Sequence, residues 1–476
     1  MKSIVLLLIT LSLCLTAQAQ LTGRKIGVDP GHGGTDPGAL GPTGYQEKEA
    51  ALMTALALKR YLEADGATVF MTRRVDSTLS LASRSGYFVS NAVDRAISVH
   101  YNSAAASARR TMDFVYCGKC AATAGMLAQP IMPRISAVTG QPFGNASSVL
   151  CAGLTNNDCP GLLGTGQANL HMAREPEIQA NIPAILVETA FITNPGDETY
   201  YRRQDNMDGA GWAIYAGTAD HFAVPPKPRQ PTPIEADEFF VRQHYVDFLN
   251  REPDAAGWDY WTAQIRACGA DAACLRARRI GVSAAFYIEL EFQDTGYFVY
   301  RFYQASFNRR PTYNEFTPDR ALVVGGADIE QGKTAFTEAW AQRAAFLQAF
   351  PTSMTPAEFV DGLNSNTGNV LTQTERDTLV AGLTSGAKIR AQVLRVIVEN
   401  QAFRSREYNK AFVLMQYFGY LKRDTDQGGF DFWLNILNQQ PANARGMVCA
   451  FITSAEYQAR FGSATPRTND ECAGNP

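Results

Sequence analysis

The stretch that decides the fold is KIGVDPGHGGTDPG, residues 25–38, close to the start of the chain. Its apolar lead-in, Ile26 to Val28, predicts a short strand, and the glycines and prolines after it predict a tight turn. His32, one of only five histidines in the chain, lies in the middle of this turn. The stretch therefore indicates a strand that ends on a residue able to bind a metal or carry a proton.

Apolar runs and helical patterns alternate through the first half of the chain. Residues 47–64 predict a helix ended by Gly66, with one apolar face formed by Leu52, Ala55, Leu56 and Leu62. Further strands are predicted at residues 68–73, 94–102, 112–117 and 182–191. The last of these is a continuous apolar run typical of a buried parallel strand. This alternation predicts an α/β domain with a mostly parallel, twisted sheet flanked by helices.

Composition and the N-terminus restrict the class of protein. The 476 residues allow two or three domains, and the net charge of −3 without any basic run argues against a nucleic-acid partner. Residues 1–19 combine Lys2, a short apolar run and a small-x-small cleavage pattern, which predicts a signal peptide. A lipid anchor on Cys14 is disfavoured by the bulky Leu13 before it. We expect an exported monomer, periplasmic or extracellular, without a transmembrane anchor.

Export favours disulfides for the eight cysteines that follow the signal peptide. Cys268 and Cys274 look like a local pair, and Cys449 is expected to hold the C-terminal tail through Cys472. One or two further disulfides are expected among Cys117, Cys120, Cys151 and Cys159, although the CGKC pattern also fits a redox motif or half of a zinc knuckle. The spacing alone leaves the connectivity open.

A proline-rich segment divides the chain. Five prolines between Pro225 and Pro233 predict a stiff, extended linker over residues 223–237. We expect the α/β domain at residues 24–222, an all-α repeat domain at residues 238–463 and a tail at residues 464–476. The repeat is visible in FVRQHYVDFLNREPDAAGWDYW from Phe240 and FVLMQYFGYLKRDTDQGGFDFW from Phe412.

The two copies agree at many offsets. Counted from Tyr245 and Tyr417, both have Leu at +4, Arg at +6, Asp at +9, Gly at +12 and Trp at +16. A decayed copy from Phe298 keeps the aromatic positions, Arg309 and Pro311. The recurring aromatic residues are expected in the core, with a sugar-stacking surface as the alternative: Tyr245, Trp261, Phe412, Tyr417 and Trp433. The DTDQGG stretch from Asp424 echoes a calcium loop, but a turn between helices is favoured because Asn435 stands where the closing glutamate belongs.

Candidate catalytic residues lie where predicted strands end. His32, His100 and Glu188 end three strands, and Glu47 begins the first helix. A single residue of this kind more often has a structural role. The carboxyl ends of parallel strands meet at one edge of the sheet, however, so these residues are expected to lie close together. Two histidines and a carboxylate form a catalytic zinc set, and a further, desolvated carboxylate such as Glu188 suits proton transfer. The glycines at 31, 33 and 34 are expected to let the backbone approach the metal closely.

Four motifs carry a family resemblance: IGVDPGHGGTDPGALGPTGYQEKEAAL, MTRRVDSTLSLASRS, NAVDRAISVHYNSA and IPAILVETAFITNPGDE. In this order they resemble the zinc-dependent N-acetylmuramoyl-L-alanine amidases, the amidase type 3 family, over about residues 24–222. The resemblance implies one zinc ion bound by His32, Glu47 and His100, with Glu188 as catalytic acid/base. It also implies the reaction, which is hydrolysis of the amide between N-acetylmuramic acid and L-alanine in peptidoglycan.

One segment departs from the family pattern. Residues 143–164 are longer than compact members need, and some relatives place an autoinhibitory helix between the second histidine and the catalytic glutamate. The segment is rich in Gly and Asn, so we expect a disulfide-pinned loop beside the cleft. His171 follows it and is interpreted as a surface or core residue, and His221 and His244 are given no role.

The helical half resembles the DUF4214 family, whose function is unknown and whose ligand here would be a protein or a glycan. The signature is FLNREPDAAGWDYW and YLKRDTDQGGFDFW. Two alternatives to the amidase remain. One is a zinc peptidase that cuts peptidoglycan stem peptides, and the other is an inactive, wall-binding amidase fold.

Overall fold

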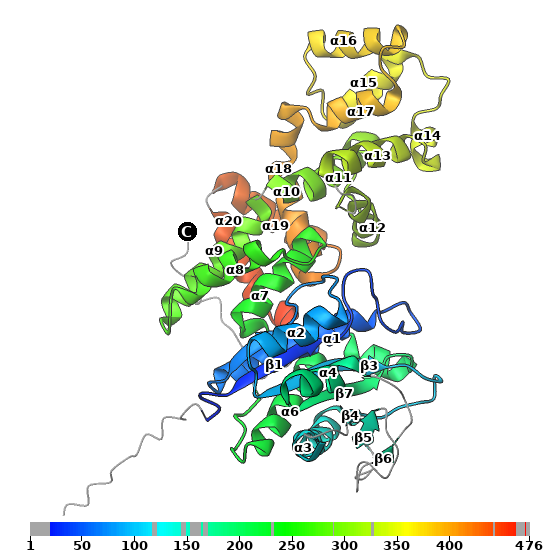
Figure 1. The fold of residues 1–476 in the computed structure, drawn as a ribbon. Coiled ribbons are helices and arrows are strands. Elements are labelled where there is room, and N and C mark those ends of the chain that lie inside the picture. The colour runs from blue at the N-terminus through cyan, green and yellow to red at the C-terminus, as the bar shows by residue number, and fades with distance from the viewer. Residues whose placement is uncertain are drawn as a thin grey trace, which may run out of the picture. The chain divides into compact units, whose positions relative to one another are not determined.

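A computed structural model describes residues 20–116, 121–143, 149–152, 163–164, 170–229, 233–288, 290–324, 328–440, 443–462 and 472 (Figure 1). The chain forms two compact units, Met1–Pro233 and Ile234–Pro476. The expected signal peptide and the side chains of Cys117, Cys120, Cys151 and Cys159 lie outside the described part. Among the described residues, no helix has both the length and the apolar character that a membrane span requires.

The first unit is built on a seven-stranded sheet with the order β2-β1-β3-β7-β4-β5-β6. Its strands are β1 (Lys25–Pro30), β2 (Thr68–Met71), β3 (Arg95–Asn102), β4 (Met112–Tyr116), β5 (Val149–Ala152), β6 (Leu163–Gly164) and β7 (Ala184–Phe191). All paired strands run parallel except β4 and β7, which are antiparallel. The predicted α/β class with a mostly parallel sheet is therefore confirmed.

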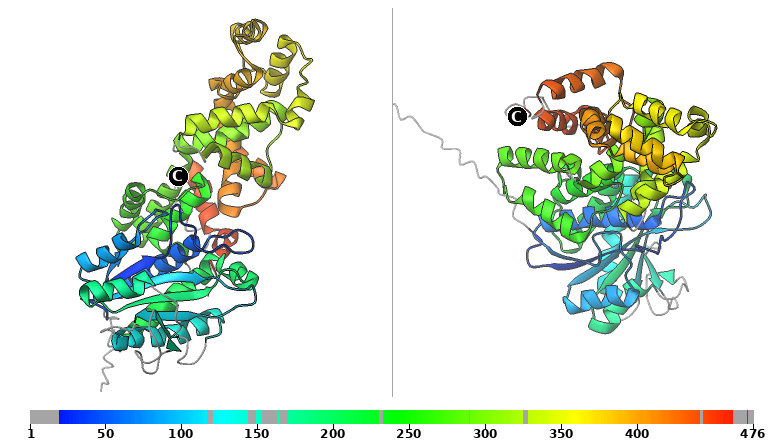
Figure 2. Two further views of the ribbon diagram at one scale, coloured as in Figure 1. Left: turned by 45° about the vertical axis from the view of Figure 1, so that its right-hand side comes forward. Right: turned by 90° about the horizontal axis from the view of Figure 1, so that it is seen from above.

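Helices cover both faces of this sheet (Figure 2). They are α1 (Glu47–Ala64), α2 (Leu81–Ser90), α3 (Ala121–Thr139), α4 (His171–Ala180), α5 (Pro195–Tyr201) and α6 (Gln204–His221). The main core packs α1, α3 and α6 against Val28, Val99 and Val187 of the sheet. A smaller core packs α2 and α4 on the opposite face, around Phe88 and Met172. Burial of these apolar faces is the main favourable free-energy term that holds the layers together.

Two details of the sheet differ from the sequence predictions. The buried run in β7 is parallel to β3, as predicted, but antiparallel to β4. An apolar run reports burial on both faces and carries no information on strand direction. Within the segment expected to be a disulfide-pinned loop, residues 143–164, the described residues 149–152 and 163–164 instead form β5 and β6 at the sheet edge, and the rest of that expected loop lies outside the described residues. Short strands of this kind give too few residues for a period-2 signal.

The proline-rich segment begins on the surface of the first unit. The Lys227 backbone N–H donates to the Tyr215 hydroxyl at 2.8 Å, and the Trp212 indole N–H donates to the Lys227 carbonyl at 2.9 Å. Both aromatic residues belong to α6. The first part of the predicted linker is thus fixed against this helix rather than fully extended in solvent.

The second unit is helical throughout the residues that are described. The order is η2 (Pro233–Glu235), α7 (Asp237–His244), η3 (Tyr245–Leu249), α8 (Ala255–Arg266), α9 (Ala272–Ile288), α10 (Leu290–Phe292), η4 (Gln293–Tyr297), α11 (Phe298–Phe307), α12 (Tyr313–Val324), α13 (Ile329–Ala341), α14 (Ala344–Ala349), α15 (Pro356–Asn366), α16 (Gln373–Thr384), α17 (Arg390–Val398), α18 (Gln401–Gln416), η5 (Tyr417–Leu421), α19 (Gln427–Gln439), α20 (Ala444–Thr453) and α21 (Ala455–Ala459). This confirms the predicted all-α class.

The repeat offsets have a structural explanation. The Asp at +9 caps the next helix by accepting from the Gly +12 backbone N–H, at 2.8 Å in the first copy and 2.7 Å in the last. A Cβ on either glycine would lie 2.3 Å from the hydroxyl oxygen of the Tyr at +0. The Arg at +6 stacks over that tyrosine, 5.0 Å and 5.3 Å from the ring centroid. The offsets therefore define one packed corner between helices.

Other predictions for this unit are confirmed or corrected by burial and bonding. Tyr245, Phe412 and Tyr417 are core residues, whereas the two repeat tryptophans are only half-buried. The stretch after Asp424 is a turn, and Asp426 caps α19. Disulfides join Cys268 to Cys274 and Cys449 to Cys472, as expected.

Candidate metal centre

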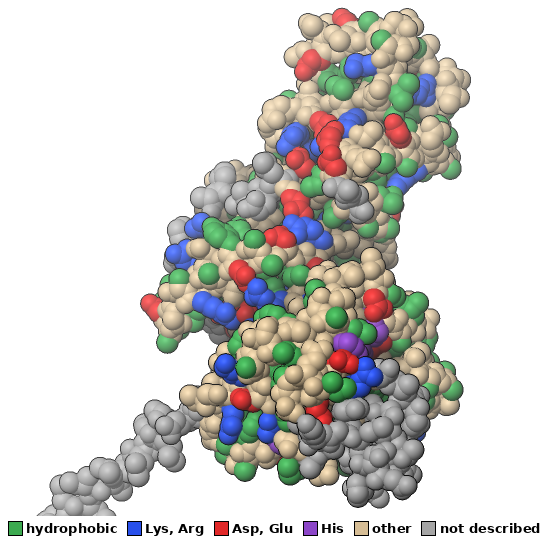
Figure 3. Space-filling model, in the orientation of Figure 1, with side chains coloured by type: hydrophobic (Ala, Val, Ile, Leu, Met, Phe, Trp, Pro, Cys, Tyr) green, Lys and Arg blue, Asp and Glu red, His purple; other side chains and the backbone are tan. Residues whose placement is uncertain are grey.

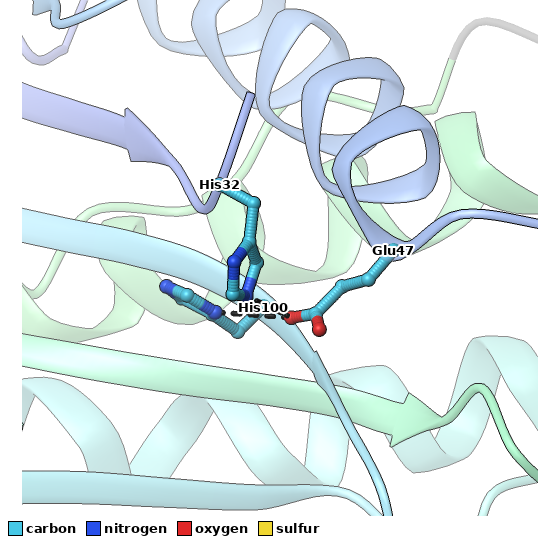
Figure 4. Close-up of side chains that lie close together, drawn as sticks. All are labelled: His32, Glu47 and His100. Carbon is cyan, nitrogen blue, oxygen red and sulfur yellow. Dashed lines mark hydrogen bonds and ion pairs between the residues drawn. The ribbon is translucent and has the colours of Figure 1, made fainter. Parts of the chain in front are cut away.

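Three predicted metal ligands meet at the carboxyl end of the parallel strands (Figure 4). The Glu47 Oε1 atom lies 3.0 Å from His100 Nδ1 and 3.2 Å from His32 Nε2. One possible ligand atom from each residue lies within 4.8 Å of the others. Two imidazoles and one carboxylate are a donor set found in catalytic zinc sites.

Each ligand comes from a different element of the fold. His32 follows β1, Glu47 is the first residue of α1, and His100 lies near the end of β3. Because β1 and β3 are parallel neighbours, their carboxyl ends bring both histidines to one edge of the sheet. The Ala39 backbone N–H donates to Glu47 Oε2 at 2.8 Å, and the Tyr101 N–H donates to Oε1 at 3.0 Å. These bonds fix the carboxylate between the two rings.

The charges of the cluster stabilise one another. Burial opposes ionisation of Glu47, but hydrogen bonds from His100 and His32 hold the pKa of its carboxyl well below its usual value. Burial also opposes a charge on His32, yet Glu47 and Asp36 together raise the pKa of its imidazole. The ionised Glu47 carboxylate therefore lies between the two rings, where it stabilises positive charge. This electrostatic character suits a divalent cation.

Asp36 orients the imidazole of His32 by binding the ring nitrogen that points away from Glu47. Its Oδ2 atom lies 2.8 Å from His32 Nδ1, so the other ring nitrogen faces Glu47. A carboxylate on the outer nitrogen is the usual way in which a metal-binding histidine is held in one tautomer. The backbone of His32 adopts a left-handed conformation, with φ of 59°, which points the side chain into the cluster from a tight turn.

Glu188 lies beside the cluster on β7. It is in register with His100 on β3, and partners in register place their side chains on the same face. Its Oε2 atom is buried and makes no hydrogen bond to any described residue. Burial, followed by the charges of Glu47 and Asp113, raises the pKa of the Glu188 carboxyl well above its usual value. A carboxyl group of this kind takes up a proton more readily than an exposed glutamate does.

Two buried arginines hold the backbone of the turn that carries His32. The Arg84 guanidinium donates to the carbonyls of Pro30 and His32 at 2.7 Å and 2.5 Å. The Arg73 guanidinium donates to the Gly31 carbonyl at 2.7 Å. Sequence reasoning did not identify these arginines or Asp36. The available signal was their position inside the quoted motifs, between the first and second histidines.

Only one of the three turn glycines predicted to let the backbone approach the metal site closely lies against a candidate ligand. A Cβ on Gly31 would lie 2.3 Å from His100 Cε1, so this residue does allow a close approach to a ligand. Gly33 and Gly34 instead pack against residues 73–78, away from the cluster. Gly38, which was not predicted, touches it: a Cβ there would lie 2.7 Å from both Glu47 Oε2 and His32 Cδ2.

The remaining histidines lie elsewhere, in agreement with the sequence interpretation. His171 accepts from or donates to the Ser85 hydroxyl at 3.1 Å, and His221 accepts from Arg95 at 3.0 Å. His244 is buried in the second unit. On the surface of the first unit, histidine side chains gather beside acidic ones (Figure 3). The side chains of His32 and His100 are 24% and 16% exposed, so a substrate could reach the cluster.

Comparison with known proteins supports the resemblance of both halves. Residues 26–220 match the N-acetylmuramoyl-L-alanine amidase family, and residues 395–461 match DUF4214, a domain of unknown function. The first match contains all four candidate site residues. The second covers only the last copy of the repeat. The resemblance of the two parts of the chain to these two families is thereby confirmed.

Two curated proteins are similar to part of this chain. N-acetylmuramoyl-L-alanine amidase AmiC of Neisseria meningitidis is 35% identical over 198 residues, covering 37% of this chain and 48% of the relative. Probable cell wall amidase LytH of Staphylococcus aureus is 32% identical over 207 residues, covering 43% and 60%. This chain thus spans about half the length of the curated relatives it matches.

A solved structure aligns with the same part. It is the catalytic domain of CwlV, an N-acetylmuramoyl-L-alanine amidase from Bacillus (Paenibacillus) polymyxa var. colistinus. It is 22% identical, has a TM-score of 0.34, and the alignment covers 42% of this chain and 99% of that one.

Proposed function

We propose that residues 24–222 form an exported zinc hydrolase that cleaves the amide between N-acetylmuramic acid and L-alanine in peptidoglycan. His32, Glu47 and His100 would hold one zinc ion, and Glu188 would act as the acid/base. The observation that carries the proposal is the convergence of these four side chains at one sheet edge, inside the segment that matches the amidase family.

The donor set fits zinc. Both imidazoles approach the same carboxylate oxygen, and Asp36 fixes the tautomer of one of them. A zinc ion in this site would polarise the amide carbonyl and make water acidic enough to attack it near neutral pH. The ionised Glu47 would offset one of the two positive charges of the ion.

The chain itself supplies proton transfer and positioning. Glu188 would accept the proton of the attacking water and deliver it to the amide nitrogen, which leaves as the amine of L-alanine. Its buried, unpartnered Oε2 atom and the raised pKa of its carboxyl support this role. Arg73 and Arg84 keep the turn in place, which fixes the position of His32.

The remaining parts of the chain would export the enzyme and bind it to an interaction partner. Residues 1–19 would direct export, residues 223–237 would connect the units, and residues 238–463 would form an interaction module followed by a tail at 464–476. The names of the relatives, an amidase and a probable cell wall amidase, support an action outside the cytoplasm.

The test is to digest purified sacculi and identify the new chemical ends. An amidase leaves a free lactyl group on muramic acid and a free L-alanine amine. New ends within the peptide stems would instead support the peptidase alternative. Binding of sacculi without any cleavage by the zinc-loaded protein would support the wall-binding alternative.

A further inference from the structure

A cavity of about 430 Å³ lies inside the second unit, between two helical faces. One face consists of Gln293, Tyr297 and Arg301, which are spaced four residues apart along η4 and α11. Residues at this spacing form one stripe on a helix. The opposite face belongs to α18 and includes Arg404 and Tyr408. A volume of this size is in the range of small-ligand sites.

The described residues that line this cavity, which we call the arginine cavity, include charged side chains of one sign only. They are Arg301, Arg404, Arg406 and Lys410, and none of the described lining residues is Asp or Glu. Lys410 is paired with Glu407 at 2.8 Å. Arg406 donates to the Gly368 carbonyl at 3.1 Å. The two remaining arginines, Arg301 and Arg404, therefore determine the net charge of the lining.

Arg301 and Arg404 are the two cations of the lining without a directly paired carboxylate among the described residues. Arg301 is 3% exposed, and its Nε–H donates to the Val398 carbonyl at 2.8 Å. The side chain of Arg404 is half-buried and makes no ion pair with any described residue. Burial, together with the like charge of Arg404, lowers the pKa of Arg301 to about 10. A buried guanidinium that faces another cation is costly until an anion neutralises it.

The nearby carboxylates are committed to another cation. Asp294 and Glu399 act on Arg301 from a distance, but both contact Lys333, at 3.9 Å and 2.5 Å. They lie outside the cavity lining. The cavity therefore keeps an excess of positive charge for a ligand.

The lining also includes a tyrosine with a buried hydroxyl. Tyr297 lines the cavity and is 2% exposed, and its hydroxyl has no hydrogen-bond partner in the described part of the chain. Its ring packs edge-on against Tyr408, with the centroids 5.5 Å apart. A buried hydroxyl without a partner is uncommon in a folded protein, and a ligand oxygen would satisfy it.

The internal repeat shows that the fold does not require Arg301. Aligned on the aromatic residues, the position of Arg301 in the second copy is Gln243 in the first copy and Met415 in the third. Both other copies pack the same kind of helix with an uncharged residue there. The arginine belongs to this cavity rather than to the repeat.

We propose that the arginine cavity binds a peptide with at least two carboxylates, namely the peptide stem of peptidoglycan. Guanidinium groups bind carboxylates through paired, charge-assisted hydrogen bonds. The choice of the stem as the carboxylate source rests on the proposed function, because the amidase domain would act where such stems are dense. The second unit would then hold the enzyme on its substrate.

The experiment uses the full chain carrying Glu188→Gln, so that cleavage within the peptide, the peptidase alternative, is excluded during the titration. The probe is the tetrapeptide stem without sugar, titrated calorimetrically, beside the same peptide with its carboxylates converted to amides. Arg301→Gln, which copies the first repeat, and Arg404→Gln should each weaken binding about tenfold. Arg278→Gln is the matched control, because Arg278 is exposed on α9 and is not part of the cavity lining. Its affinity should stay within about twofold.

The outcomes separate this inference from the proposed function. Equal affinity of the amidated peptide, or unchanged affinity in Arg404→Gln, would overturn it. Tighter binding of inorganic phosphate than of the peptide would also overturn the carboxylate assignment. Hydrolysis of sacculi by the wild-type chain is measured separately: its absence would refute the amidase but leave arginine-dependent peptide binding intact.

Discussion

Replacing Gly31 with Ala should disable the metal centre while leaving the fold intact. The new Cβ would lie 2.3 Å, 2.5 Å and 2.6 Å from Cε1, Nε2 and Nδ1 of His100. Ordinary contact begins at 3.4 Å, so the ring must move back by about 1 Å. Metal ligands tolerate only about 0.2 Å of error in distance. The imidazole can therefore no longer share a site with His32 and Glu47.

We expect zinc affinity to fall by about 100-fold, which corresponds to nearly 3 kcal/mol. The backbone at residue 31 is not in the left-handed region, so alanine introduces no strain there. The unfolding temperature of the metal-free protein should therefore change little, or rise slightly because alanine restricts the unfolded chain. Zinc affinity is measured by competition with a calibrated chelator, and stability is followed by circular dichroism.

Gly86→Ala provides the matched control. Gly86 lies in α2 of the same unit, also outside the left-handed region, and a Cβ there meets nothing within 4 Å. This variant should bind zinc like the wild type. If Gly31→Ala also keeps wild-type zinc affinity, His100 is not a ligand and the reasoning fails.

Three further predictions concern proton transfer and the second unit. Glu188→Gln should reduce hydrolysis by about 10³-fold without changing zinc content, measured by product release and metal analysis. Asp247→Asn should destabilise the second unit by about 3 kcal/mol, because Arg460 and Lys422 lose their buried counter-charge. Hydrogen bonds and ion pairs with these two cations outweigh burial and lower the pKa of Asp247 to about 2. The wild-type advantage should therefore persist at pH 5 and disappear only as the pH falls through about 2, which urea titrations followed by tryptophan fluorescence would show. Burial lowers the pKa of His244 to about 4, so the unfolded chain binds the extra proton between pH 6.5 and 4. Stability should fall by about 3 kcal/mol as the pH drops through that window, and His244→Gln should remove this dependence.

The elements with strong periodicity were predictable. The helix at residues 47–64 was predicted with the bounds that the structure has, because its apolar residues recur at helical spacing and Gly66 follows it. The antiparallel pairing of β4 with β7 was not predictable, since burial alone sets the apolar run in β7. The strands β5 and β6 were missed because they are too short to show a pattern.

The candidate metal ligands were easier to find than the residues that hold them. His32 and His100 follow predicted strands, and parallel strands bring their carboxyl ends together whatever their detailed register. Asp36, Arg73 and Arg84 are residue types common on any surface. Only the folded turn shows that Asp36 bonds to the imidazole of His32 and that the two arginines donate to backbone carbonyls of the same turn.

In the helical repeat the pattern could be found from the sequence, but its structural cause could not. The spacing of Asp at +9 and Gly at +12 was plain from the alignment of two copies. Its cause, a helix cap beside a tyrosine hydroxyl, depends on the packing of two helices and appears only in the structure. The charge of the arginine cavity likewise needs two helices far apart in sequence.

The most direct test of the central claim is digestion of purified sacculi with a zinc-analysed preparation, with and without a chelator. The account predicts one zinc ion per chain and release of stem peptides that begin with a free L-alanine amine. It also predicts loss of this activity on chelation and its return when zinc is restored. Release that continues in the fully metal-free protein, or new ends that lie within the stems, would contradict the account.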